Sequence, residues 1–253
     1  MISIVMPAYN AGKYIKDAIE SVVRQSYTDW ELIIVDDCSG DKTKEIAESC
    51  GDERIRVFSN TANMGAAGSR NKGIRLAQGD CIAFLDADDC WDEYKLEKQA
   101  ALNADFSFTG SGFIDETGEQ IDYVLHVPSE VNFEKLLGQN VISNSSVVIK
   151  KELIEGYPFP EHVKNIHEDY AVWLSILRTG ITAQGIDEPL LKYRVIDSSK
   201  SSDKRNAALM NWNVYRYLKL SYPKSIISEV RYAVNGIKKW REIRRRITVK
   251  TKN

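Results

Sequence analysis

Cys81-Ile-Ala-Phe-Leu-Asp-Ala-Asp-Asp-Cys-Trp91 is an apolar run that ends abruptly in three carboxylates within four residues. Its apolar part, Ile82 to Leu85, is continuously rather than alternately hydrophobic, which is typical of a strand buried on both faces of a parallel sheet. Ligands of open α/β sheets bind beyond the carboxyl ends of such strands. The acids at the end of this run therefore stand where a ligand would bind.

Two of these acids, Asp86 and Asp88, are two positions apart, and side chains with that spacing in an extended chain share a face. Carboxylates that converge repel one another unless a cation lies between them, and hard oxygen ligands favour Mg²⁺ or Mn²⁺. We therefore predict a divalent metal site of the kind that bridges a diphosphate. The alternative is the first turn of a helix, where acids are favourable and where Asp92 and Glu93 also stand. That alternative suits Asp89 better than the pair, which precedes any expected helix.

The residues before this run alternate between apolar strands and amphipathic helices. Strands are expected at 2–6, 30–35 and 55–58. Helices are expected after each of them, at 14–25, 42–49 and 66–77. Together with the strand that begins at Cys81, this order gives a βαβαβαβ half of the Rossmann kind. Neither a GxGxxG nor a GxxxxGKS/T loop follows the first strand, which argues against an NAD enzyme or a P-loop NTPase.

Side chains suited to a nucleotide follow these strands. Tyr9 lies in the turn after the first strand, where an aromatic ring can stack on a base or serve only in packing. Asp37 ends the second strand and can accept the N–H of a base. The small residues of 65–73 lead into a helix, from whose start Arg70 and Lys72 can reach phosphate; on a helical surface both could equally be solvated.

The composition bounds the class of protein. With 253 residues, 43% of them hydrophobic, the chain suffices for one large α/β domain, or for one domain with a C-terminal appendage. Its four cysteines form no CxxC pair, so we expect free thiols in a reducing cytoplasm rather than a zinc site or disulfides. No segment approaches the roughly 20 apolar residues of a membrane span, and the first residues lack the basic start of a signal peptide. We therefore expect a protein on the cytoplasmic side.

The formal net charge of −2 hides a strong asymmetry. Residues 231–252 carry nine Lys and Arg against one acid, a local charge of +8 that leaves −10 for the rest. A basic amphipathic stretch of this kind, with Trp240 among its cations, suits an anionic membrane surface at the inner face of the cell membrane. We expect no nucleic acid as a partner, because no stacking platform or binding motif accompanies the charge. A solvated helix is the remaining alternative.

Four motifs resemble, in order, the signatures of the inverting family 2 bacterial glycosyltransferases, which have the GT-A fold. They are Ser-Ile-Val-Met-Pro-Ala-Tyr-Asn at 3–10, Val-Asp-Asp-Cys-Ser-Gly-Asp at 35–41, Asn-Met-Gly-Ala-Ala-Gly-Ser-Arg-Asn-Lys-Gly at 63–73 and Phe-Leu-Asp-Ala-Asp-Asp at 84–89. The resemblance covers residues 1–202, and it is specific because both order and spacing match. It is nearest in character to enzymes of capsule, O-antigen or teichuronic-acid synthesis.

The resemblance implies a fold and an activity. The fold would be an α/β GT-A domain at 1–202, with a Rossmann-like, mostly parallel central sheet flanked by helices. Within it, 1–90 would be the nucleotide-sugar half and 91–202 the acceptor half, and 203–253 would be a helical, basic C-terminal extension. The activity would be transfer of a sugar, with inversion, from a UDP-sugar to a hydroxyl of a glycan or lipid-linked glycan in surface polysaccharide synthesis.

The resemblance also assigns the donor site. Uridine would be held by residues at the first two strand ends, namely Pro7, Ala8, Tyr9 and Asp37. Arg70 would approach the diphosphate, and Asp86-Ala-Asp88 would be the DxD metal motif, with Asp88 the better ligand of Mn²⁺ or Mg²⁺ and Asp86 nearer the ribose or a water. A Ser-rich loop that includes Ser199 would fold over the diphosphate. Ile196 departs from the pattern, because many relatives carry His at that position.

On the acceptor side, Glu168 and Asp169 open an amphipathic helix that ends near residue 177. Helix capping alone would explain both acids, but the resemblance places the general base here. Asp169 would be the base, and Glu168 would orient it or contact the acceptor. His167 and Ser145 are further candidates for contacts with the acceptor, although a lone His is more often an ordinary turn residue.

Two other functions are compatible with parts of the sequence. A phosphohydrolase of the haloacid-dehalogenase type also binds Mg²⁺ at a strand-end Asp-x-Asp, but that motif normally opens the chain and here it follows the fourth strand. The other possibility is a catalytically idle, nucleotide-sugar-binding subunit of a polysaccharide-assembly complex. The presence of both the Asp86-Ala-Asp88 run and the Glu168-Asp169 pair argues against it.

Overall fold

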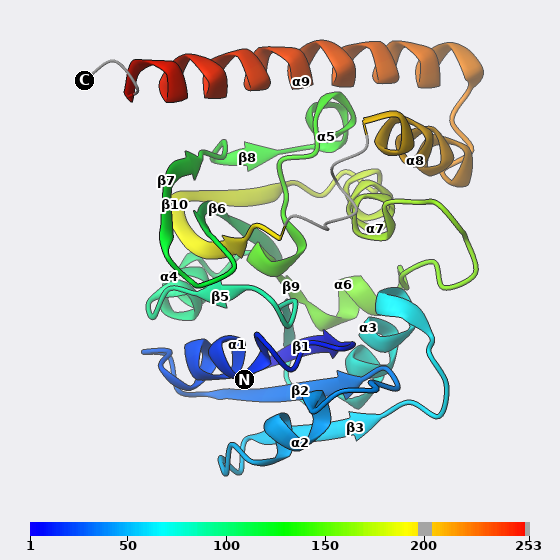
Figure 1. The fold of residues 1–253 in the computed structure, drawn as a ribbon. Coiled ribbons are helices and arrows are strands. Elements are labelled where there is room, and N and C mark those ends of the chain that lie inside the picture. Colours follow the sequence, from blue (N-terminus) through cyan, green and yellow to red (C-terminus); the bar gives the residue numbers. More distant parts are fainter. Residues whose placement is uncertain (197–203, 251–253) are drawn as a thin grey trace.

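The computed structural model describes residues 1–196 and 204–250, and for 204, 205 and 237–250 it describes the backbone alone. Its first part is a parallel sheet in the order β3-β2-β1-β4 (Figure 1). The strands are β1 (Ile2–Ala8), β2 (Trp30–Asp36), β3 (Ile55–Ser59) and β4 (Cys81–Phe84). The helices that connect them are α1 (Ile15–Val23), α2 (Thr43–Glu48) and α3 (Gly65–Leu76). All four strands point the same way, so their carboxyl ends meet at one edge.

The second part of the chain extends the same sheet with mixed directions. Next to β4 lies antiparallel β9 (Val148–Lys150), followed by β6 (Phe106–Ile114), β10 (Ala183–Arg194) and β5 (Cys90–Trp91). β6 and β10 run parallel to each other, whereas β7 (Gln120–Leu125) and β8 (Glu130–Val131) pair antiparallel at the margins. The helices of this part are α4 (Lys95–Leu102), α5 (Phe133–Gly138), α6 (Lys151–Glu155) and α7 (Glu168–Leu177).

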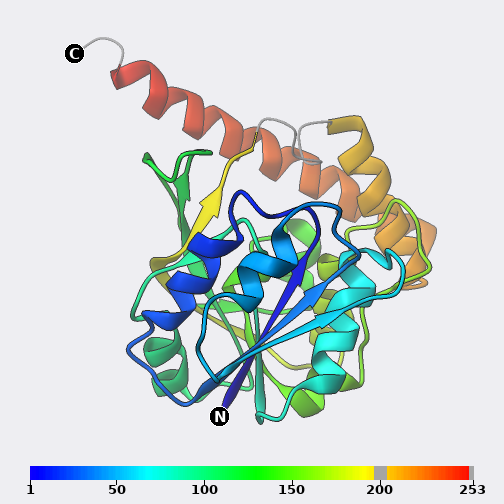
Figure 2. The ribbon, with the colours of Figure 1, turned by 60° about the horizontal axis from the view of Figure 1, so that its bottom comes forward.

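The sheet separates two hydrophobic cores, because alternate residues of a strand point to opposite faces. Ile4 and Met6 of β1 pack with α1, α2 and α4, whereas Val5 belongs to the cluster that holds α3 and α7. The second cluster is centred on Trp173 of α7, whose ring lies 5.8 Å from that of Phe84. Figure 2 turns the molecule so that α1 and α2 come toward the viewer in front of the sheet. The mostly parallel sheet flanked by helices that the sequence predicts is thereby confirmed.

Two helices close the chain. α8 (Lys204–Tyr217) places Val214 and Tyr215 in the same cluster as Trp173, so the boundary expected at residue 202 does not separate two hydrophobic cores. α9 (Tyr222–Lys250) crosses the top of the molecule over α5 and α8 (Figure 1). Within the described residues, no helix is both long and apolar enough to span a membrane.

Candidate active site

The acidic run lies where the sequence predicted it, in the turn that follows β4. Leu85 continues the pairing with β1 through its N–H, 3.1 Å from the Val5 carbonyl. The chain then turns, and the N–H of Asp89 donates to the carbonyl of Asp86 at 3.0 Å. This turn presents the Asp86 and Asp88 side chains at the carboxyl edge of the sheet, where both stay partly exposed.

Asp89 has a different role from its two neighbours. It is 2% exposed, and its carboxylate accepts the Ser145 hydroxyl at 2.7 Å and the backbone N–H of Arg194 at 3.0 Å. Burial, together with the charges of Asp88 and Asp86, raises the pKa of Asp89 well above its usual value. α4 begins only at Lys95, so the alternative that Asp89 opens a helix is wrong. Asp89 instead links the acidic turn to Arg194, the last residue of β10.

Ser145 makes two further contacts that hold this turn in place. The N–H of Asp86 donates to the Ser145 hydroxyl at 3.1 Å, and the indole N–H of Trp91 donates to the Ser145 carbonyl at 2.7 Å. The Lys95 side-chain nitrogen lies 4.0 Å from the centre of the Trp91 ring and donates to Gln99. Lys95 is fully buried, and burial holds its pKa well below the usual value. Nothing in the sequence spacing marks Trp91 as a partner of Ser145 or Lys95 as a partner of Trp91, so neither role was predicted.

Arg194 completes the support from β10. Its side chain is almost entirely buried, donates from Nε to the Asp88 carbonyl at 2.8 Å and pairs with Asp17 at 3.1 Å. These contacts give Arg194 a structural role behind the acidic turn. Ile196 lies two residues further on, and the Ser-rich loop with Ser199 lies outside the described residues.

Arg70 joins the acidic turn to the opposite side of the site. Its guanidinium donates to Asp86 at 2.7 Å and to Glu168, the first residue of α7, at 3.2 Å. Burial lowers the pKa of Arg70, but the charges of Asp86 and Glu168 outweigh it and leave that pKa above its usual value. Its Nε is buried and has no partner among the described residues. Arg70 thus brings together two acidic motifs that are far apart in the sequence.

The start of α7 carries the expected acidic pair. Burial, reinforced by the charge of Glu168, raises the pKa of Asp169 to about 6, although Arg70 acts in the opposite direction. The N–H of Tyr170 donates to the Asp169 carboxylate at 2.7 Å. A carboxylate with this pKa is largely ionised at neutral pH and can accept a proton. Its place as the general base is a prediction that the geometry permits.

The acidic turn fits a divalent cation. Burial, followed by the charge of Asp86, raises the pKa of Asp88 to about 6. No ion pair among the described residues includes Asp88. No group of three or more acidic, His or Cys side chains in the described chain could hold a metal ion by itself. Mg²⁺ is commonly bound by one or two carboxylates that are completed by substrate phosphates and water, which is the donor set available here.

The expected nucleotide end lies beside the ends of β1 and β2. Tyr9 is 55% exposed at the edge of the sheet, while Ala8 is buried and Pro7 is partly buried. The Asp37 carboxylate accepts the N–H groups of Met64 and Gly65 at the start of α3, at 2.8 and 2.7 Å. Asp37 therefore supports the Gly-rich helix, and its expected contact with a base stays a prediction.

The two loops at this edge are bonded to each other. Asn10, after β1, accepts the N–H of Gly40 at 2.8 Å and donates its own N–H to the Ser39 hydroxyl at 3.0 Å. Asn10 and Cys38 both adopt left-handed backbone conformations, with φ of 49° and 65°. These tight turns hold the loops around Tyr9 in one arrangement.

Two predicted acceptor residues are placed differently. His167 is the residue before α7 and is partly buried, and burial lowers its pKa. Ser145 is 2% exposed with its hydroxyl shared between Asp86 and Asp89, so the structure favours a positioning role over the expected contact with the acceptor. Asn144, which the sequence analysis did not single out, donates to Asp86 at 3.3 Å.

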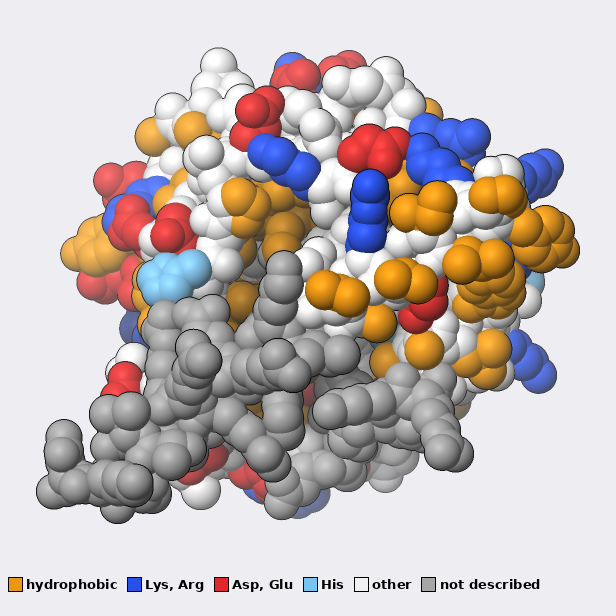
Figure 3. All heavy atoms as spheres, turned by 90° about the horizontal axis from the view of Figure 1, so that it is seen from above, with side chains coloured by type: hydrophobic (Ala, Val, Ile, Leu, Met, Phe, Trp, Pro, Cys, Tyr) orange, Lys and Arg blue, Asp and Glu red, His pale blue; other side chains and the backbone are white. Residues whose placement is uncertain are grey.

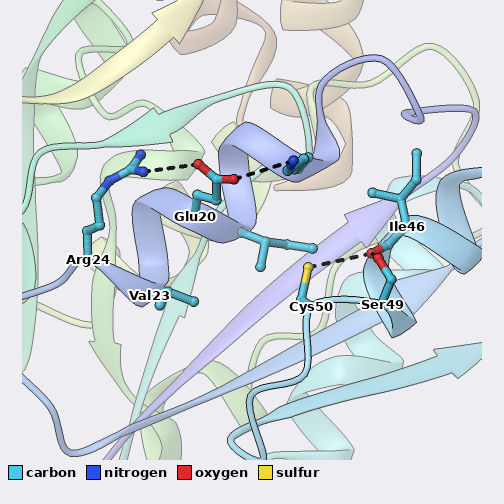
Figure 4. Close-up of a pocket in the computed structure, with 8 residues that line it drawn as sticks. Glu20, Val23, Arg24, Ile46, Ser49 and Cys50 are labelled. Atoms are coloured by element: carbon cyan, nitrogen blue, oxygen red, sulfur yellow. Dashed lines mark hydrogen bonds and ion pairs between the residues drawn. The ribbon is translucent and has the colours of Figure 1, made fainter.

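A separate pocket of about 410 Å³ lies between α1 and α2 (Figure 4). Glu20 stands between Arg24, at 3.1 Å, and Lys16, at 3.9 Å, and Cys50 faces them from the end of α2. The pocket is lined by Lys16 and Arg24 against the acid Glu20, so its lining is net positive, and it shares no residue with the acidic turn. Glu20 is paired with two cations, whereas Asp88 at the sheet edge has no ion-pair partner among the described residues.

Comparison with known proteins places the chain in a family. Residues 3–126 match the family model "Glycosyl transferase family 2". A Bacillus subtilis protein named as a putative teichuronic acid biosynthesis glycosyltransferase, TuaG, is 40% identical over 94% of this chain and 97% of its own length. The chain belongs to glycosyl transferase family 2. A further relative, from Escherichia coli, is 36% identical over 94% of both chains and is named UDP-Glc:alpha-D-GlcNAc-diphosphoundecaprenol beta-1,3-glucosyltransferase WfgD.

A solved structure shares the architecture of this family 2 chain. S. aureus TarS 1-349, in complex with UDP-GlcNAc, superimposes with a TM-score of 0.69 at 20% sequence identity. The match covers 85% of this chain and 66% of that one. At this identity the likeness concerns the fold, and it confirms the GT-A fold that the four sequence motifs predict.

Proposed function

We propose that this family 2 chain is an inverting, metal-dependent glycosyltransferase that moves a sugar from a UDP-sugar to a hydroxyl of a lipid-linked glycan in surface polysaccharide synthesis. One observation carries the proposal: Arg70 bridges Asp86 of the acidic turn and Glu168 at the start of α7. The bridge brings a metal-type carboxylate and a carboxylate pair suited to base catalysis to one edge of the sheet. The name of the Escherichia coli relative supports the UDP-sugar and the lipid-linked acceptor, and the name of the Bacillus subtilis relative supports synthesis of a surface polysaccharide.

Asp169 performs the proton transfer in this mechanism. The acceptor hydroxyl attacks the anomeric carbon of the donor while its proton passes to the Asp169 carboxylate. The bond between the anomeric carbon and the diphosphate oxygen breaks at the same time, and its electron pair leaves with UDP. One displacement inverts the anomeric centre. Glu168, held by Arg70 at 3.2 Å, keeps the start of α7 in place beside the acidic turn.

Asp88 and Asp86 would hold Mn²⁺ or Mg²⁺, and the bound cation supplies neutralisation of the charge that develops on the leaving diphosphate. Arg70 already lies against Asp86, with its buried Nε free of any partner in the described chain, so it is placed to contribute positive charge at the same end. At the nucleotide end, the exposed ring of Tyr9 stacks on uracil. The base then lies beside Pro7, Ala8 and the loop after β2.

In this proposal the enzyme acts at the inner face of the cell membrane, where a lipid-linked glycan is available. The basic residues of 231–252 attract the protein to anionic lipid as a peripheral protein.

A donor screen tests the proposed activity. Purified protein is incubated with UDP-sugars, with and without Mn²⁺, and UDP release is measured in the presence and absence of a diphospholipid-linked sugar acceptor. We expect release that depends on Mn²⁺ and increases with the acceptor, together with far weaker binding of ADP and GDP than of UDP in calorimetry. Release of inorganic phosphate from sugar phosphates without acceptor would instead favour the phosphohydrolase. Tight UDP binding with no turnover for any donor would favour a non-catalytic binding subunit.

A further inference from the structure

The outward side of α9 carries exposed aliphatic side chains. Ile226, Ile227, Val230 and Val234 are 54%, 53%, 58% and 45% exposed. Their spacing of one, three and four residues places them on one side of a helix. Figure 3 looks onto α9 from above and shows hydrophobic side chains gathered on this face of the molecule. These four residues are called the α9 stripe below.

The opposite side of α9 is packed against the body of the protein, which fixes the direction of the stripe. The ring of Tyr232 lies 6.1 Å from that of Tyr170 in α7. The Asn235 amide donates to the carbonyl of Gly138, at the end of α5, at 3.0 Å. Because these inward contacts come from the same helical turns as the stripe, the stripe cannot turn inward without breaking them.

The size of the stripe argues against a second copy of this chain as its occupant. At the exposures given, the four side chains present roughly 400 Å² of surface, about half of what each partner buries in a stable dimer. That area nevertheless reaches the size at which exposed apolar patches mark interaction sites. The occupant must therefore gain affinity from something in addition to the stripe.

The sequence that follows on the same helix supplies that addition. α9 continues to Lys250, and residues 238–250 include seven Lys and Arg against the single acid Glu242. An apolar stripe followed by cations complements a surface that is apolar below an anionic layer, which describes a lipid leaflet with anionic headgroups. No described helix can span a membrane, so the contact is one in which the helix lies along the surface.

We propose that α9 lies flat on an anionic lipid leaflet, with the α9 stripe inserted among the headgroups. The inference rests on the proposed function only in placing the enzyme at a membrane. It adds to the charge of residues 231–252 an apolar contact that salt does not screen. It also orients the enzyme, because α9 crosses the acceptor half, over α5 and above α7 (Figure 1), and turns that half toward the leaflet.

Sedimentation with vesicles tests the stripe. Full-length protein is mixed with phosphatidylcholine vesicles that contain phosphatidylglycerol, at low salt and at roughly 1 M NaCl, where the Debye length is about 3 Å. The test variant carries Ile227→Ser, Val230→Ser and Val234→Ser, changes at solvent-exposed positions. The control is Val23→Ser, because Val23 is 41% exposed on α1, away from α9 in both ribbon views (Figures 1 and 2).

We expect the unmodified protein and the control to retain vesicle binding at high salt, and the triple variant to lose it by roughly tenfold or more in partition coefficient. Equal sedimentation of the triple variant and the unmodified protein at high salt would overturn the inference. So would an unmodified protein that is a dimer in light scattering and becomes a monomer in the triple variant, because the stripe would then be a contact between copies.

UDP binding in the presence of Mn²⁺ is measured in parallel on the same proteins without vesicles. We expect it to be unchanged by the triple variant, which also shows that this variant folds. Absence of UDP binding in the unmodified protein would count against the proposed function and leave the lipid contact to be decided by sedimentation.

Discussion

Asp169 and Asp88 have similar pKa values, each raised to about 6 mainly by burial, yet the proposed mechanism gives them separable roles. Asp169→Asn removes a proton acceptor and little else, so we expect UDP binding to stay nearly intact while turnover falls by about 10²-fold or more. Asp88→Asn should instead abolish the metal dependence of UDP binding. Calorimetry with UDP and Mn²⁺ and a transfer assay separate the two. Full transfer activity in Asp169→Asn would place the base elsewhere.

The pKa of Asp169 also predicts a pH profile. The base must be ionised, and because burial and Glu168 raise its pKa to about 6, the ionised fraction falls as the pH drops through that value. We expect kcat/KM to be level near neutral pH and to decrease about tenfold per unit well below pH 6. The same acid limb, measured with saturating Mn²⁺ so that Asp88 stays ionised, should vanish from the residual activity of Asp169→Asn. An unchanged limb in that variant would assign the titration to another group.

Ser145 is predicted to act through the acidic turn and not through the acceptor. Ser145→Ala leaves the buried carboxylate of Asp89 without one of its donors, which costs about 1–3 kcal/mol of stability, and it removes the hydroxyl that accepts the backbone N–H of Asp86. We expect weaker Mn²⁺-dependent UDP binding and an unchanged KM for the acceptor. Ser146→Ala is the matched control, since its hydroxyl donates only to the Ser143 carbonyl. A raised acceptor KM in Ser145→Ala alone would restore the original expectation.

Strands were predicted best where their burial produces a clear hydrophobic pattern in the sequence. The run of residues 106–114 predicts a strand, and it forms β6, whose residues are almost all buried. β7 was not predicted, because it lies at the margin of the sheet with its first half exposed and its sequence, Gln-Ile-Asp-Tyr-Val-Leu, is only weakly apolar. The two-residue β5 was missed because it is too short to produce a pattern. The apolar residues 147–149 predict a strand as well, and the observed strand, β9, begins one residue later, after a turn of 3₁₀ helix at Asn144–Ser146.

In the site, too, local sequence patterns could be predicted, whereas contacts between residues far apart in the sequence could not. The acids at 86–88 and 168–169 stand out in the sequence because each follows or opens an apolar element. Their meeting through Arg70 does not, because Arg70 and Glu168 are 98 positions apart and no periodicity reports which distant side chains touch. The contact of Asn144 with Asp86 was beyond the sequence for the same reason. Both sets of contacts depend on the order of strands in the sheet.

The first half of α9 is predicted to stabilise the fold. Because residues 203–253 lie outside the four motifs, the sequence alone predicts that a cut after Ser225 leaves UDP binding intact. Residues 226–236, however, include Tyr232 and Asn235, which pack on α7 and α5. Because loss of a packed aromatic side chain costs about 3–5 kcal/mol, we expect a marked fall in Tm for that cut. A cut after Gly236 keeps these contacts and should leave Tm and UDP binding nearly unchanged. Equal Tm values for the two truncated proteins would show that α9 does not stabilise the fold.

The net charge is divided unevenly along the chain: residues 231–252 carry +8, and the rest of the protein carries about −10. Each Lys or Arg near an anionic leaflet contributes about 1 kcal/mol, so engagement of half of the local charge gives roughly 4 kcal/mol of attraction. That is enough for reversible binding, and salt should weaken it because the contact is exposed. The acidic body is repelled by the same leaflet, which leaves the C-terminal end as the side that approaches it.

The cut after Gly236 separates this charge from the α9 stripe, because it removes eight of the nine cations and leaves Ile226 to Val234 in place. We expect the shortened protein to lose most of its low-salt sedimentation with anionic vesicles and to keep the weaker, salt-resistant fraction that the stripe provides. A replacement of the same cations by Gln in the full-length chain should reproduce this result, since it changes charge without changing length. Should either protein sediment at low salt as fully as the unmodified one, residues 237–252 would act as a solvated helix and attraction to the membrane would have to arise elsewhere on the surface.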